Sequence, residues 1–186
     1  MGGSRRGRFC CDGADGDGGG NRAIAGRYLF VATYYSTTIC VFERDATTGR
    51  LTLRRTFENP DRKKWRWARL LARSDADGLT VLYYLCKGTL SAYRVEIETG
   101  ECRLIGRWEG LGNAPSVFTP DGRRLFTSDA VLARAADGAC SMEKRRKRSA
   151  EALLFSPAAR HFYEATHTHI FVHDYDVVTG ALNEKY

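Results

Sequence analysis

Residues 170–186 read IFVHDYDVVTGALNEKY: a β-type run, an acidic turn closed by Gly180, and a second β-type run. The same phrase occurs three more times, and every copy has a turn glycine in the same place. The other copies are ICVFERDATTGRLTL (residues 39–53), LSAYRVEIETGECRL (residues 90–104) and AVLARAADGACSM (residues 130–142). A unit built of strands that returns about every 40–50 residues predicts a β-propeller.

Two further strands are expected before each of these phrases. Upstream of every copy lies a segment rich in aromatic and β-branched residues, a composition typical of strands: residues 28–33, 79–85, 124–127 and 161–165. A turn such as Pro120-Asp121-Gly122 comes before three of them, and a short apolar segment precedes each turn: residues 68–72, 116–119 and 152–155. The repeat therefore predicts strand a, turn, strand b, loop, strand c, T-G-type turn and strand d, which together make one four-stranded antiparallel blade.

The fold class that follows is all-β: a β-propeller of about four blade-like repeats over residues 23–186. The strands are apolar on both sides, as expected of blades that neighbours cover on both faces. Residues 1–22 are rich in Gly, Asp and Arg and poor in apolar residues, so we predict a disordered leader there. Residues 61–72 are the one segment for which we consider a helix.

The composition is that of a globular protein, with 43% hydrophobic residues in a chain of 186. No apolar run approaches the roughly 20 residues that a membrane span needs, so we expect no membrane association and a cytoplasmic protein. The six cysteines form no C-x-x-C pair, which argues against a zinc or redox motif. Cys102 and Cys140 each follow a turn glycine by two residues, and we interpret both as small buried hydrophobic residues.

The net charge of +7 is concentrated in two basic patches. The first, KRRKR at residues 144–148, lies between strand d of the third repeat and strand a of the fourth; we favour a solvated loop over a nuclear-localisation or polyanion-binding signal. The second surrounds Trp65 and Trp67, which we interpret as a strand edge packing into the core rather than a base-stacking surface. We therefore expect no nucleic-acid partner. No P-loop or dinucleotide fingerprint is present, and we expect no cofactor.

Three segments carry a resemblance to a known family: GRYLFVATYYSTTICVFERDATTGRLTL (residues 26–53), GNAPSVFTPDGRRLFTSD (residues 112–129) and LLFSPAARHFYEATHTHIFVHDYDVVTGAL (residues 153–182). Together they resemble the lactonase-type, 6-phosphogluconolactonase-like (YVTN-repeat) seven-bladed propellers. The resemblance covers residues 27–186. The related gluconolactonase and regucalcin group shares the D-x-x-T-G-x-L phrase and remains an alternative.

The resemblance implies a hydrolase of carbohydrate metabolism whose substrate is a small sugar-acid lactone of the 6-phosphogluconolactone type. Because the family's ring is about twice this length, it also implies a partial or truncated member. Four blades would leave such a ring open, and the exposed blade faces predict self-association. The alternative function is a non-catalytic propeller scaffold that binds a protein or polyanion, or a degenerate fragment without activity.

No catalytic constellation of the family can be matched residue by residue, so candidates come from the expected loops at the channel mouth. Asp129, His167 and His169 are candidate catalytic residues, because a carboxylate or imidazole can activate water for attack on a lactone carbonyl. Lys63, Lys64 and Asn113 are candidate substrate-binding residues, because cations and amides suit phosphorylated or carboxylated sugars.

All four histidines lie between residues 161 and 173. The i, i+2 spacing of His167 and His169 predicts two imidazoles on one side of a strand. A hairpin turning around His167 would pair His161 with His173 and leave Glu164 on the opposite face. Such a site lacks a third ligand, so we predict surface histidines and no metal.

Overall fold

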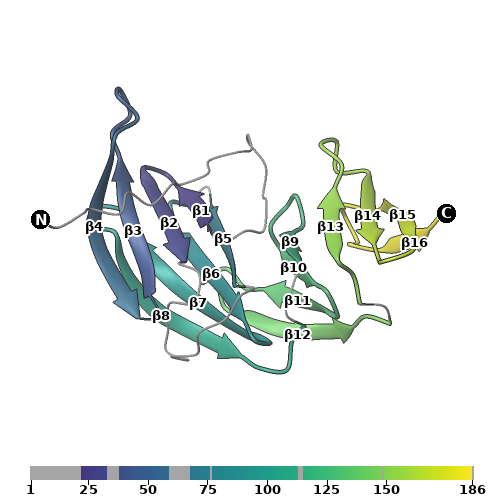
Figure 1. Cartoon of the computed structure of the whole chain (residues 1–186). Coiled ribbons are helices and arrows are strands. Elements are labelled where there is room, and N and C mark those ends of the chain that lie inside the picture. Colours follow the sequence, from purple (N-terminus) through teal and green to yellow (C-terminus); the bar gives the residue numbers. More distant parts are fainter. Residues whose placement is uncertain are drawn as a thin grey trace, which may run out of the picture.

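The computed structural model describes residues 22–32, 38–58, 68–75, 77–112, 115–147 and 149–185, and within these ranges the chain is all-β. The strands form four antiparallel sheets of four strands each, and in every sheet the strands pair in sequence order. This is the blade meander expected from the repeat. Figure 1 shows the four sheets following one another along the chain, from purple to yellow.

The four blades are defined by their strands. Blade 1 is β1 (Arg22–Ala25), β2 (Tyr28–Ala32), β3 (Thr38–Arg44) and β4 (Leu51–Glu58). Blade 2 is β5 (Arg69–Ser74), β6 (Thr80–Cys86), β7 (Thr89–Glu96) and β8 (Glu101–Trp108). Blade 3 is β9 (Ser116–Phe118), β10 (Arg124–Thr127), β11 (Ala130–Arg134) and β12 (Cys140–Arg145). Blade 4 is β13 (Ala152–Phe155), β14 (His161–Ala165), β15 (Ile170–Tyr175) and β16 (Leu182–Glu184).

The predicted a and b strands are confirmed to within two residues wherever the structure describes them. The helix considered over residues 61–72 is wrong for its last four residues, because they belong to β5, which pairs with β6 from Arg69↔Leu85 onward. Residues 61–67 of that segment, with Trp65 and Trp67, lie outside the described residues. Strand β1 was not predicted, since its short RAIA sequence carries little strand signal.

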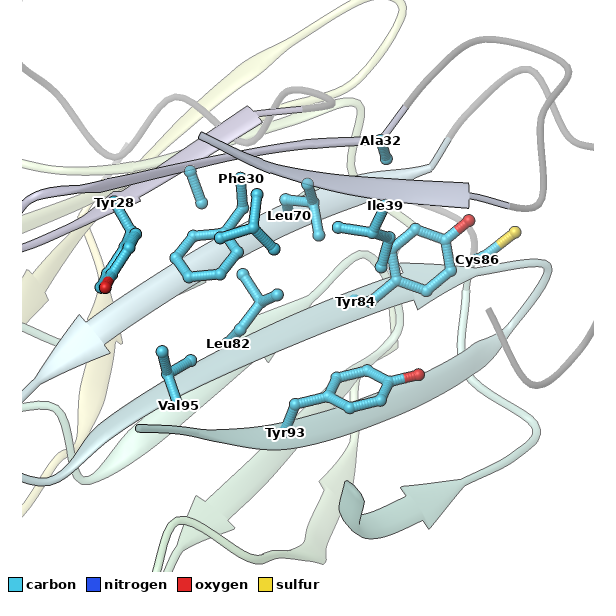
Figure 2. Close-up of a cluster of buried hydrophobic side chains, with 12 residues drawn as sticks. Tyr28, Phe30, Ala32, Ile39, Leu70, Leu82, Tyr84, Cys86, Tyr93 and Val95 are labelled. Carbon is cyan, nitrogen blue, oxygen red and sulfur yellow. The ribbon is translucent and has the colours of Figure 1, made fainter. Parts of the chain in front are cut away.

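The continuous apolar run of β6 is explained by burial on both faces. Leu82, Tyr84 and Cys86 pack toward blade 1, whereas Val81 and Tyr83 pack toward blade 3. Figure 2 shows the first of these clusters, where side chains of blades 1 and 2 meet between the two sheets. A third cluster joins blades 3 and 4. The core of this protein is therefore divided into layers between successive blades, as propeller packing requires.

The two cysteines that follow turn glycines occupy these layers. Cys140 belongs to the cluster between blades 2 and 3, and Cys102 packs against the cluster between blades 1 and 2. Burial raises the pKa of each thiol to about 12. Both residues therefore serve as small hydrophobic side chains, as the sequence predicted.

The turn between strands c and d has the same construction in blades 1 and 4. Asp45 accepts hydrogen bonds from the backbone N–H groups of Thr47 and Thr48, at 3.0 and 2.7 Å. Asp176 accepts one from Val178 at 2.8 Å and one from Thr179 at 3.2 Å. These backbone donors lower the pKa of both carboxyls, because they stabilise the charged form. The largest effect comes from the N–H of Thr48 on Asp45 and from the N–H of Thr179 on Asp176.

We expect the stability of the protein to fall as the pH drops below about 4, the usual carboxyl pKa. The two carboxyls titrate lower in the folded chain than in the unfolded chain, so their contribution is present above about pH 4 and is lost as the pH falls through the folded pKa. The double variant Asp45→Asn, Asp176→Asn keeps one acceptor oxygen in each side chain. Its melting temperature should fall less than that of the wild type between pH 5 and pH 2. Identical pH profiles for the two proteins would contradict this role.

Candidate functional site at the b–c loop end of the blades

In a four-stranded meander the b–c loops and the connections from strand d to the next blade lie at the same end of the blade. At this end the structure describes three segments of blades 3 and 4: the turn at Ser128 and Asp129, the connection after β12, and the turn between β14 and β15. The three predicted substrate-binding residues Lys63, Lys64 and Asn113 lie outside the described residues.

Asp129 lies at this end and links two blades. Its Oδ1 accepts a hydrogen bond from the backbone N–H of Gly112 at 2.5 Å, and its Oδ2 lies 2.7 Å from Nη1 of Arg145. The hydroxyl of Thr127 donates to Oδ1 at 3.2 Å. The approach requires glycine at 112, since a Cβ there would overlap the Ser128 hydroxyl. Through these contacts Asp129 holds the blade 2–3 connection in place.

His167 and His169 both lie at this end, but in the turn between β14 and β15 and not on a strand. The prediction that they share one side of a strand is therefore wrong. The Nε2 of His167 lies 2.7 Å from Oε1 of Glu151, and the His167 side chain is 87% exposed. The Nδ1 of His169 lies 2.7 Å from the Thr168 hydroxyl, and its ring stacks on Phe171 at 5.8 Å. His167 thus forms an imidazole–carboxylate pair that faces solvent.

The predicted pairing of His161 with His173 is wrong by one residue. The turn spans residues 166–169, so β14 and β15 pair as His161↔Asp174 and Phe162↔His173. A slip of one residue moves a side chain to the other face of a sheet. As a result Glu164, which was expected on the far face, lies on the same face as His173, with 3.5 Å between its Oε2 and the His173 Nε2.

Glu164 and His173 belong to a buried charged cluster with Arg146. The Nη2 of Arg146 lies 2.5 Å from Oε2 of Glu164, and the three side chains are only 5–8% exposed. Arg146 also donates through Nη1 to the carbonyl oxygens of Thr127 at 2.9 Å and Ser128 at 3.3 Å. One guanidinium therefore joins the b–c turn of blade 3 to strand b of blade 4.

This cluster corrects the interpretation of KRRKR as a solvated loop. Lys144 and Arg145 belong to β12, and Arg146 is buried, whereas Arg148 lies outside the described residues. The signal for the buried pair was present in HFYEA (residues 161–165), where Glu164 follows the buried Phe162 by two residues and therefore lies on the same face of the strand. An acidic residue at an inward position of an apolar strand indicates a buried cation nearby.

The described cavities open at the opposite end, beside the a–b and c–d turns. Cavities of about 460, 480 and 450 Å³ lie there at the three blade junctions, and arginines and carboxylates line each of them. Most of these charges are paired, for example Arg134 with Asp75 at 2.5 Å and Arg124 with Glu143 at 2.7 Å. Within the described ranges no group of three metal-binding side chains comes together, and no helix long and apolar enough to cross a membrane is found.

No family model matches the sequence, and no curated protein matches it. Solved structures do match the fold. A "putative 6-phosphogluconolactonase" from Bacteroides uniformis superposes with a TM-score of 0.66 at 15% identity, over 87% of this chain and 51% of that one. Saccharomyces cerevisiae Sqt1 superposes with a TM-score of 0.59 at 7% identity, over 87% and 45%. The fold is a β-propeller. The periplasmic gluconolactonase PpgL of Pseudomonas aeruginosa also matches, with a TM-score of 0.50 at 17% identity, over 87% and 67%.

At these identities the likeness concerns the fold and not the reaction. The chain spans about half the length of the first of these structures. The WD40 domain of SCAP from fission yeast also matches, with a TM-score of 0.56 at 12% identity, so the same arrangement of blades is found in a WD40 domain.

Proposed function

We propose that this propeller hydrolyses a sugar-acid lactone, of the 6-phosphogluconolactone type, at the b–c loop end of its blades. The fold supports the proposal through its likeness to a lactonase-type propeller. The observation that carries it is the pair formed by His167 and Glu151, with 2.7 Å between Nε2 and Oε1. A carboxylate that pairs with one imidazole nitrogen orients the ring, and an oriented imidazole suits a group that takes a proton from water.

The proposed reaction needs one base and no covalent intermediate. The imidazole of His167 takes a proton from water, and the resulting hydroxide oxygen forms a bond to the lactone carbonyl carbon. The bond between that carbon and the ring oxygen then breaks, and the ring oxygen takes the proton back from the imidazolium. The product is the open hydroxy acid, so water and lactone are fully accounted for.

The other candidates have distinct roles in this proposal. Asp129 positions the blade 2–3 connection through Gly112 and Arg145 and is not the base. Lys63, Lys64 and Asn113 remain predicted contacts to the phosphate or hydroxyl groups of the substrate. His169 contacts Thr168 and Phe171 and so stabilises the turn between β14 and β15; it takes no part in the proposed chemistry.

Replacing His167 by Asn should lower kcat for 6-phosphogluconolactone hydrolysis by about 100-fold, the lower end of the range for general bases, because the ring is exposed to water. The Glu151→Gln variant should lose part of that rate. The His169→Asn variant is the matched control from the same turn and should retain activity. Rates must be corrected for spontaneous hydrolysis of the lactone, and equal rates for the two histidine variants would overturn the assignment.

One observation favours the alternative of a polyanion-binding scaffold. The outer strand of each of the first three blades carries two cations: Arg54 and Arg55 on β4, Arg103 and Arg107 on β8, and Lys144 and Arg145 on β12. Binding to heparin that weakens steeply with salt, and that is lost on replacing Lys144 and Lys147 by Ser, would favour the scaffold. Absence of any lactone hydrolysis above the spontaneous rate would exclude the enzyme.

A further inference from the structure

The three junctions between blades share one construction at the c–d turns. The first or second side chain of strand b in one blade lies over the turn glycine of the next: Tyr28 over Gly100, Val81 over Gly138 and Arg124 over Gly180. A Cβ at Gly100 would lie 3.1 Å from Tyr28, and a Cβ at Gly138 would lie 2.5 Å from Val81. The glycines are thus required by positive φ, between 69° and 88°, and also by a close neighbour.

Hydrogen bonds repeat at the same places. The Tyr28 hydroxyl donates to the carbonyl of Glu98 at 3.2 Å, and the Arg27 guanidinium donates to the same carbonyl at 2.8 Å. The Tyr83 hydroxyl donates to the carbonyl of Gly138 at 2.8 Å. Arg124 donates to the carbonyl of Thr179 at 3.4 Å. The c–d turns of blades 2, 3 and 4 therefore each receive a donor from the blade before them.

At each end of the arc, one side of such a junction has no counterpart among the described residues. Gly49 has the same turn and a φ of 71°, but nothing in the described chain lies within 4 Å of the position of its Cβ. At the other end, His161 begins β14 as Tyr28 begins β2, and its side chain is 38% exposed. Arg160, which precedes it as Arg27 precedes Tyr28, is exposed. Blade 4 thus presents the donor half of a junction, and blade 1 presents the acceptor half.

The two outward faces are also apolar, like the buried faces of the inner blades. On blade 1 an apolar row crosses all four strands: Ile24, Leu29, Phe42 and Leu53. On blade 4 two apolar rows cross three strands: Leu154, Tyr163 and Val172, and Ala152, Ala165 and Ile170. Exposure reaches 62% for Ile24, 61% for Leu154 and 69% for Ile170. Contiguous exposed apolar faces of this kind mark interaction surfaces.

Opposite charges lie on the two faces near the same end. Asp174 lies on the open face of blade 4, in register with His161, and Arg44 lies on the open face of blade 1, in register with Leu51. Asp174 also lies 3.5 Å from Nζ of Lys185 within blade 4, so the charges add little to the match. The two faces therefore complement one another in donors and acceptors and in apolar rows. Neither face has this relation to a second copy of itself.

We propose that two copies of this chain associate head to tail, with blade 4 of each copy stacked on blade 1 of the other, and close a ring of eight blades. In this ring His161 lies over Gly49 of the partner copy, and Arg160 donates to the carbonyls of the turn that begins at Asp45. Eight blades lie within the range known for propellers. This chain covers 51% of the matched structure from Bacteroides uniformis, so two copies are about as long as that chain. Closure also places the b–c loop ends around one channel.

The mass of the 186-residue chain in solution tests the proposal, by light scattering coupled to size exclusion. We expect twice the 20.8 kDa of one chain, without larger species as the concentration rises. A monomer at every concentration would overturn the proposal. Species that keep growing with concentration would overturn the closed ring, because an open head-to-tail contact makes filaments.

Two variants test the head-to-tail arrangement. Variant A carries Leu154→Arg and Ile170→Arg on blade 4, and variant B carries Ile24→Arg and Leu53→Arg on blade 1; all four side chains are exposed, so the chains should fold. Each alone should be a monomer, and an equimolar mixture should form a 1:1 pair through its one intact junction. Val178→Arg, in an exposed turn, should leave the wild-type mass. A dimer of either variant alone, or a mixture that stays monomeric at 100-fold the concentration at which the wild type pairs, would overturn the arrangement.

Discussion

Replacing Arg146 by Met is expected to destabilise the protein by about 3–5 kcal/mol. The guanidinium is the cation beside the buried carboxylate of Glu164, and its removal leaves that charge without its partner between two blades. The change also removes the donor to the carbonyls of Thr127 and Ser128. Unpaired buried charge is among the few causes of destabilisation this large.

The matched control is the neighbouring residue. Arg145→Met breaks the ion pair between Arg145 and Asp129, whose side chains are 53% and 32% exposed. The variant should lower the free energy of unfolding by no more than about 1 kcal/mol. Chemical denaturation measures both free energies of unfolding. The double variant Arg146→Met, Glu164→Gln should recover part of the loss, because the buried charge is gone. Equal losses for Arg145→Met and Arg146→Met would show that Arg146 is an ordinary surface cation.

The second large effect is expected for Phe162→Ala, at about 3–5 kcal/mol. Phe162 is fully buried in the cluster between blades 3 and 4, with its ring centroid 4.9 Å from that of Phe126 and 4.8 Å from that of Phe155. Within one chain, blade 4 is packed on a single side, so this cluster is its main attachment. The cavity should therefore loosen blade 4 before the rest of the chain.

Hydrogen exchange distinguishes loss of one blade from loss of the whole fold. In Phe162→Ala, amides of β14 and β15 should exchange faster while those of β6 keep their protection. The control Val178→Ala, in a turn of the same blade and 84% exposed, should change neither the stability nor the exchange. Uniform acceleration across all four blades would contradict the account of blade 4 as the separately held unit.

The fold was predictable from the sequence because each blade carries its own strand and turn signals. The repeated D-x-x-T-G turn needs a positive φ at glycine, and the aromatic runs before it need burial on both faces, as in β6. What the sequence left open was register. The turn between β14 and β15 has four residues, 166–169, so it is not centred on His167. The register therefore differs by one residue from the predicted one, and Glu164 and His173 lie on the same face of the sheet instead of on opposite faces.

The candidate site was less predictable than the fold, because its contacts join residues far apart in the chain. Asp129, His167 and His169 lie in b–c turns, but their partners Gly112 and Glu151 come from other connections. Arg146 looked like one of five equivalent cations. Its buried ion pair with Glu164 and its packing against Phe162, with the guanidinium carbon 5.7 Å from the ring centroid, distinguish it from its neighbours.

The blades stack face to face, so that blade 2 is covered on both sides. Hydrogen exchange of the wild-type chain tests it most directly, through the peptides of β6 and β4. Every residue of β6 is buried, whereas β4 is an outer strand with mostly exposed side chains. We expect β6 to exchange slowest of all the described strands and β4 to be among the fastest. Exchange of β6 as rapid as that of β4 would contradict the stacking of the blades.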